Sequence, residues 1–450
     1  MLNVLIFYAM YGAGLLAGLF RNPVYTFSLY EAVYFFSPHQ RWWGSMIPDV
    51  GYSFFVVVFM IGMLCLNHKQ AKQNKLFQIP QFRWMYLLLF LYSVAYFYAV
   101  LPESHLEASI TFLKLVITIS VAYKLCDTDT KLDYVLYGYV FGAWYIGFLA
   151  FQTGRNSGDR LEGIGTTDAP DSNGIAAAIA PCLVLCLYYF WTGKSWLSKG
   201  LVVIAGAFIA NGLILINSRG AFLGAGASLA YFMLHMYFSS FQRKFQKSMA
   251  IFITVTGLAG AGLIMDETFL ARINTFSGAD TELNEDQETG ATRIFFWKAA
   301  WEMAKDHPFG AGNRAFEYYA PFYVPAQIDT GHSRNRAVHS TWFENLSEAG
   351  YLSLLTFTIM LYSAHRTLIK CKKELRKTNR VDEYFKMIAV QAALLAFIVA
   401  MTFINRMRAE ILYWLILYTA CAYNIYVLKG GAANSTSSPS INTNLPYRGP

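Results

Sequence analysis

The sequence predicts an all-α, polytopic membrane protein with about 12–13 transmembrane helices and one large outer loop that contains an amphipathic helix. Three observations support this fold class. The 450 residues are 55% hydrophobic and only 14% charged, long apolar stretches alternate with short polar ones, and basic residues recur in every second connection. Soluble domains carry about 25% charged residues, so we expect the lipid bilayer to be the main solvent of this chain.

A transmembrane helix needs roughly 20 mainly apolar residues. The second apolar segment is shorter than this, so it either crosses the membrane or re-enters it. The first has no basic start and no small-residue cleavage site before Arg21, which indicates a retained helix rather than a signal peptide. The expected helices lie near 2–20, 24–37, 49–67, 84–102, 107–124, 132–151, 172–191, 199–217, 219–238, 248–265, 340–363, 385–403 and 409–428.

Basic residues orient these helices, because connections rich in Lys and Arg face the cytoplasm. The pattern predicts a multi-pass protein of a bacterial inner membrane. The net charge of +8 then reflects orientation, and we exclude nucleic acid as a partner. The residues are Lys69, Lys72, Lys75, Arg83, Lys124, Lys131, Lys194, Lys199, Arg243, Lys244, Lys247, Arg366, Lys370, Lys372, Lys373, Arg376, Lys377 and Arg380.

This orientation divides the chain into four parts. Residues 1–265 form an N-terminal transmembrane bundle, 266–339 a periplasmic loop domain, and 340–428 the C-terminal transmembrane helices. The polar residues 429–450 are expected to form a disordered cytoplasmic tail.

The loop domain changes character along its length. It is acidic over 277–290, whereas from Thr292 apolar residues recur at helical spacing until His307-Pro308. This predicts an amphipathic helix that lies on the membrane or on the bundle. Its apolar face would consist of Phe296, Trp297, Ala300, Trp301 and Ala304.

Two arginines are the first candidates for chemistry. Arg219 interrupts two apolar runs, and its small neighbours Ser218 and Gly220 let an anion approach; the alternative is an arginine that snorkels at a helix end. Arg293 opens the loop helix, where the helix dipole disfavours a cation. That position favours a specific anionic partner over a side chain that is merely solvated.

Further polar residues surround the same loop. With the first two arginines, Arg334, Arg336, Arg406 and Arg408 would form an outward-facing cluster, and guanidinium forks suit a diphosphate. His339, where the loop re-enters the membrane, would be a neutral base or a helix-capping residue, with His332 as a rival. Glu344 would share in proton transfer or pair with a buried arginine.

A third polar patch, Asp168 to Gly174, precedes the helix at 172–191. Asp171 and Asn173 are candidate substrate-binding residues, although a helix N-cap is the alternative, favoured for Ser172. The six cysteines lie within or beside predicted helices, and no glycine-rich nucleotide loop is present. We therefore expect no metal and no cofactor.

The order of these motifs resembles the O-antigen ligase and polymerase family of membrane glycosyltransferases. The resemblance covers the chain from Asp168 onward, although Ser353 stands where ligases have Gly, Thr or Tyr. The stretch 36–44 is similar to the exosortase-associated O-glycosylation ligases, a branch of the same family. The matching pieces are Asp171-Ser-Asn173-Gly-Ile-Ala176, Ser218-Arg219-Gly220-Ala221, Thr292-Arg293 with Trp297, His307-Pro308-Phe-Gly310-Ala-Gly312, and His339-Ser340 followed at Gly350.

The resemblance implies a GT-C-like fold and a metal-independent enzyme whose donor is a glycan on undecaprenyl diphosphate at the periplasmic face. Arg219 and Arg293 would hold the diphosphate, and His339 would activate the acceptor hydroxyl. The product would be a surface polysaccharide, either lipopolysaccharide or exopolysaccharide.

The sequence leaves the acceptor open. A lipid-linked glycan would make the protein a polymerase, lipid A core a ligase, and a protein hydroxyl an O-oligosaccharyltransferase. A lipid-glycan flippase or transporter is the alternative from another class. It is disfavoured because the polar residues gather at one face beside one loop and no internal repeat is seen.

Overall fold

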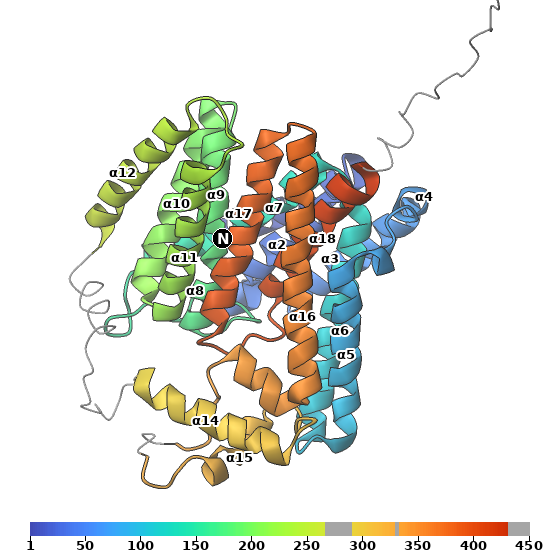
Figure 1. Cartoon of the computed structure of the whole chain (residues 1–450), viewed down its shortest axis with the longest axis vertical. Helices are drawn as coiled ribbons and strands as arrows, with labels where there is room; N and C mark the ends of the chain where they lie inside the picture. Colours follow the sequence, from blue (N-terminus) through green and yellow to red (C-terminus); the bar gives the residue numbers. More distant parts are fainter. Residues whose placement is uncertain (266–289, 329–332, 431–450) are drawn as a thin grey trace, which may run out of the picture.

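The computed structural model describes residues 1–265, 290–328 and 333–430, and these are helical with no strand (Figure 1). The predicted acidic segment up to residue 289, His332 and the tail from 431 lie outside the described residues. The helices are α1 (Leu2–Phe20), α2 (Tyr25–Phe36), α3 (Tyr52–Leu66), α4 (His68–Ala71), α5 (Pro80–Val94), α6 (Pro102–Leu125), α7 (Asp129–Thr153), α8 (Ser172–Ile179), α9 (Pro181–Thr192), α10 (Trp196–Ile216), α11 (Arg219–Phe238), α12 (Gln246–Ile264), α14 (Gly290–Asp306), α15 (Ala315–Tyr323), α16 (Thr341–Lys377), α17 (Val381–Met401) and α18 (Glu410–Tyr423), which continues as a π-helix over Asn424–Lys429.

Every apolar segment expected to be helical is helical, which confirms the all-α polytopic fold class. Within the described ranges, nine helices are long and apolar enough to cross a membrane, or ten if the bent pair Tyr52–Leu66 and His68–Gln78 is one span. Among the nine, α8 and α9 together count as one span, and α18 and its π-helical extension together count as another. The expected segments 24–37, 84–102 and 248–265 are helical but are not among them.

The short second segment forms α2, which is buried along nearly its whole length. Twelve residues make a helix of about 18 Å, well short of the roughly 30 Å hydrocarbon core. Its neighbours in space include α1, α3 and α7. Because it is surrounded by protein, this helix does not depend on lipid contact along its sides.

The connections predicted to be cytoplasmic meet at one end of the bundle. Asp127, between α6 and α7, accepts hydrogen bonds from Gln70 after α3 (2.9 Å) and from Lys429 at the end of α18 (3.0 Å). Lys386 in the first turns of α17 pairs with Asp129 at the start of α7 (2.6 Å). The helices α14 and α15 lie at the opposite end (Figure 1), as an alternating topology requires.

The loop domain has a small hydrophobic core of its own. α14 covers the expected range and ends at Asp306, and its buried residues pack with those of α15. The predicted apolar face is correct for Phe296, Ala300 and Ala304, which are buried. It is wrong for Trp301, which is 48% exposed because it turns toward Tyr351 instead (ring centroids 6.2 Å apart).

The loop domain is joined to the bundle where α16 is interrupted. Gly350 has a positive φ of 79°, which breaks the helical hydrogen-bond ladder at that point. The segment 308–312 repairs the ladder: Ala311 and Gly312 donate to the carbonyls of Ser347 and Glu348 (3.0 and 2.8 Å), and Tyr351 donates to Pro308 (3.0 Å). Helix ends that are buried need such partners.

Two glycines allow this close crossing. A Cβ atom on Gly310 would lie 2.4 Å from the carbonyl group of Glu348, and one on Gly350 would lie 2.4 Å from the Pro308 oxygen. Both glycines also have positive φ angles, 81° and 79°. The spacing of glycines in the His307 to Gly312 motif and at Gly350 therefore reflects backbone contact between two segments far apart in sequence.

We predict that Gly350→Ala lowers stability by at least about 2 kcal/mol, because the side chain meets backbone and requires a left-handed conformation. The matched control is Gly226→Ala in α11, where a Cβ meets nothing within 4 Å. The melting temperatures of the two purified variants in detergent provide the measurement. Equal melting temperatures would show that the crossing is not a structural constraint.

Candidate functional site

A cavity of about 610 Å³ lies where the loop domain meets the bundle. Five segments enclose it: the α7–α8 connection, α8, the α10–α11 junction, the start of α14 and the end of α17. Its size is within the usual range of ligand sites. The lining residues are Ser157, Gly158, Asp159, Arg160, Glu162, Asn173, Ala177, Asn217, Ser218, Arg219, Gly220, Ala221, Arg293, Ala400, Phe403 and Ile404.

The two arginines singled out by the sequence both line this cavity. Arg219 is the first residue of α11, two residues after Asn217, whose φ of 58° ends α10 in a left-handed turn. Arg293 comes from α14 and donates from Nη1 to the carbonyl of Phe403 (3.2 Å). Two guanidinium groups that are 74 residues apart in sequence thus belong to one site.

A third lining arginine, Arg160, was not anticipated. It belongs to a hairpin over 155–162, in which Asn156 holds the backbone N–H and carbonyl of Glu162 through its side-chain amide (2.8 and 3.1 Å). Arg160 donates to Asn173 Oδ1 (2.8 Å). The only sequence signal was a polar connection rich in charge, which is also what an ordinary surface loop looks like.

The Asp171 to Gly174 motif mainly stabilises the fold around the start of α8. Asp171, not Ser172, is the N-cap of α8: its Oδ1 accepts from the Gly174 amide (2.8 Å) and its Oδ2 pairs with Arg406. A Cβ on Gly174 would overlap the Arg406 guanidinium. Of the two predicted substrate-binding residues here, Asn173 lines the cavity and Asp171 does not.

Arg406 and Arg408 do not join the other arginines at the cavity. Burial lowers the pKa of a guanidinium, but Asp171 and Asp168 outweigh this effect at Arg406 and raise its pKa above the ordinary value. Burial lowers the pKa of Arg408 to about 10, so it still carries its charge at neutral pH. Arg406 pairs with Asp171 and Arg408 contacts the buried Glu348, and neither arginine lines the cavity, so the expected single outward-facing cluster is not formed.

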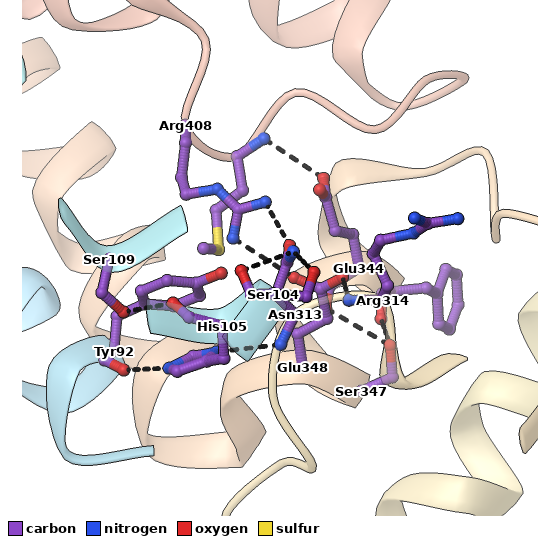
Figure 2. Close-up of polar contacts among 12 residues, drawn as sticks. Tyr92, Ser104, His105, Ser109, Asn313, Arg314, Glu344, Ser347, Glu348 and Arg408 are labelled. Carbon is purple, nitrogen blue, oxygen red and sulfur yellow. Dashed lines mark hydrogen bonds and ion pairs between the residues drawn. The ribbon is translucent and has the colours of Figure 1, made fainter. Parts of the chain in front are cut away.

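Figure 2 shows the network around Arg408. Its guanidinium donates to Asn313 Oδ1 (2.7 Å), contacts Glu348 (3.4 Å) and lies over the ring of Tyr92 (4.8 Å). The amide N–H of Asn313 donates to His105 Nδ1 (2.9 Å), so Nε2 of the same imidazole carries the proton and donates to the carbonyl of Tyr92 (2.7 Å). This network ties the loop domain to α5, α6 and α16.

Arg334 and Arg336 also lie away from the cavity lining. Arg334 donates to the carbonyls of Pro325 and Ala326 (3.0 and 3.3 Å), so it closes the end of α15. Arg336 is half-buried in the same segment. Their closeness to His339 in sequence suggested a place in the site, because the carbonyl partners of Arg334 cannot be located from sequence.

His339 sits beside the cavity rather than in its lining. The next residues are fixed to the α17–α18 connection: the Ser340 amide donates to Asn405 Oδ1 (3.0 Å), and the Thr341 hydroxyl donates to the carbonyl of Ile404 (2.7 Å), a lining residue. His339 itself has a φ of 50°. Positive φ at a residue other than glycine often marks a functional site.

Glu344, predicted to share in proton transfer or to pair with a buried arginine, supports this connection. Its side chain is buried, and Oε2 accepts from the backbone N–H of Met407 (3.2 Å). The carboxylate is not part of the cavity lining. Its position indicates that it orders the segment that carries Phe403 and Ile404.

The fold and the cavity define a polytopic α-helical membrane protein with a cavity that is rich in arginine beneath its loop domain. Residues 204–358 match the family model described as O-antigen ligase (Wzy_C), which confirms the resemblance and supports an enzyme with a role in glycan transfer at a membrane. The matched segment contains Arg219, Arg293 and His339 but not the hairpin over 155–162. The comparison with curated proteins found no match.

We predict that Arg408→Met lowers stability by about 3–5 kcal/mol, because it leaves the buried Glu348 carboxylate without its cation. Adding Glu348→Gln to this variant should restore part of the loss. Lys305→Met is the matched control, since Lys305 is 53% exposed and pairs with Glu302 at the surface. Thermal unfolding of the purified variants measures these differences; a double variant less stable than Arg408→Met would refute the pairing.

Proposed function

We propose that the protein is a glycosyltransferase of the O-antigen ligase type, which transfers a glycan from undecaprenyl diphosphate to an acceptor hydroxyl at the periplasmic face of a bacterial inner membrane. The observation that carries this proposal is the cavity lined jointly by Arg219, Arg293 and Arg160. Guanidinium groups bind phosphate oxygens in bidentate fashion. Three guanidinium groups from separate segments match a diphosphate better than they match a single phosphate.

The orientation supports the periplasmic assignment. The basic connections meet at the end opposite α14 and α15, and basic connections face the cytoplasm. The cavity then opens where a lipid carrier presents its glycan after crossing the membrane. On this account residues 1–265 and 340–428 form the membrane scaffold, and the described residues 290–328 and 333–339 cover the site.

The chemistry is a single displacement at the anomeric carbon. The acceptor oxygen forms the new bond, the bond to the diphosphate oxygen breaks, and undecaprenyl diphosphate leaves with the electron pair. Arg219 and Arg293 stabilise the charge that develops on the leaving diphosphate. His339 takes the acceptor proton; it precedes Ser340 and Thr341, which are held to Asn405 and to the carbonyl of the lining residue Ile404.

We predict that Arg293→Lys slows glycan transfer about 100-fold, because an ammonium group keeps the charge but cannot supply two parallel hydrogen bonds. Arg219→Ala should be at least as damaging. Arg314→Lys, on the same loop domain but in a surface ion pair, is the control and should keep normal activity. Rates are compared in membranes that contain equal amounts of each variant; near-normal transfer by Arg293→Lys would argue against bidentate binding.

We predict that His339→Asn abolishes transfer without reducing the amount of protein in the membrane. Asparagine tolerates positive φ, so this change removes the base while leaving the backbone at 50° unstrained. Transfer and abundance are measured on the same membranes. Loss of the protein, or retention of activity, would instead indicate a structural role for this histidine.

Analysis of surface glycans in a deletion strain identifies the acceptor. Single repeat units would indicate a polymerase, complete polymer left on its lipid carrier a ligase, and an unglycosylated surface protein an O-oligosaccharyltransferase. Unaltered surface glycans and unaltered lipid-linked intermediates would contradict the proposed function in all three forms.

A further inference from the structure

The lining of the cavity divides into two chemical halves. The guanidinium groups of Arg160, Arg219 and Arg293 can only donate hydrogen bonds. The carboxylates of Asp159 and Glu162, which are exposed, offer only acceptors at neutral pH. A ligand that fills the whole cavity must therefore bring both acceptors and donors.

Asn217 identifies one position at which the ligand should donate a hydrogen bond. The residue is 1% exposed, and its Nδ2 donates to the carbonyl of Asp159 (3.4 Å), which fixes the orientation of the amide. Asn217 lines the cavity, and its Oδ1 is buried and meets no hydrogen-bond donor among the described residues. A buried acceptor without a partner costs about 1–3 kcal/mol, so a ligand that donates there gains that amount.

A diphosphate cannot serve this half of the cavity. Its ionised oxygens accept hydrogen bonds and repel carboxylates, whereas the hydroxyl groups of a sugar donate as well as accept. We propose that Asp159 and Glu162 of the hairpin, together with Asn217, form the subsite for the sugar attached to the diphosphate, and that their side-chain oxygens accept hydrogen bonds from its hydroxyl groups. This inference rests on the proposed function and adds the part of the donor that sets glycan specificity.

The hairpin is built to hold these acceptors at a fixed distance from the arginines. The Leu161 amide donates to the carbonyl of Leu215 (2.9 Å), and Arg160 Nε donates to that of Ile216 (3.4 Å). Both carbonyls belong to the last turn of α10, directly before Arg219. The sugar subsite and the first diphosphate ligand therefore move as one unit.

The hairpin is also anchored from the other side of the bundle. Arg41, which is buried, donates to the carbonyl of Ile164 (3.1 Å) and to those of Phe35 and Phe36 (2.9 Å each). This places the stretch 36–44 behind the wall of the cavity.

The test uses two probes on the full-length protein in nanodiscs: undecaprenyl diphosphate without a glycan, and the lipid-linked glycan extracted from the deletion strain. Asp159→Ala with Glu162→Ala should weaken binding of the glycan-bearing lipid about tenfold and leave binding of the bare lipid unchanged. Asn217→Gly, which keeps the left-handed turn, should act in the same direction. Glu103→Ala with Glu107→Ala, two exposed acids at the same end of the bundle but outside the cavity, is the control.

The outcomes separate this inference from the proposed function. Unchanged affinity for both lipids, or an equal loss for both, in the Asp159 and Glu162 double variant would overturn the sugar subsite. Failure of Arg219→Ala to weaken binding of the bare lipid would instead overturn the diphosphate site. A tenfold loss confined to the glycan-bearing lipid supports the subsite.

Discussion

The backbone crossing between Gly310 and Gly350 is the constraint on which the site depends. Gly350 interrupts α16, so the carbonyls of Ser347 and Glu348 need partners from outside the helix. Because the segment 308–312 satisfies them, the loop domain is fixed to a membrane helix by hydrogen bonds that side-chain mobility cannot loosen. This attachment places Arg293 in the same cavity as Arg219, which begins α11 at the α10–α11 junction.

Polar and charged groups reinforce the same arrangement. Arg408, Asn313 and Glu348 connect the loop domain to the bundle on one side of the crossing, and Arg406 with Asp171 connects α8 to the α17–α18 connection on the other. Groups of this kind are costly to bury unless each is satisfied. Their pairing therefore favours one docked position of the loop domain over alternatives that would leave charges without partners.

The helices were predictable because a bilayer requires each backbone group to form its hydrogen bond within its own segment. A long apolar segment must therefore be a helix. Arg219 and Arg293 were found because each is costly in its local setting. Arg406 and Arg408 were grouped with the cavity because their partners, Asp171 and Glu348, lie more than 50 residues away in sequence and could not be located from it. Arg160 gave no local signal beyond a charged polar connection; only the docking of its hairpin on α10 gives it a role.

The central claim is that Arg219 and Arg293 jointly bind the diphosphate of the donor. A cryo-electron microscopy structure of the wild-type protein in nanodiscs with undecaprenyl diphosphate tests it most directly. The account predicts diphosphate oxygens within hydrogen-bond distance of both guanidinium groups, inside the cavity between α11 and α14. A diphosphate bound elsewhere, for example beside Arg334, or held by only one of the two arginines, would contradict it.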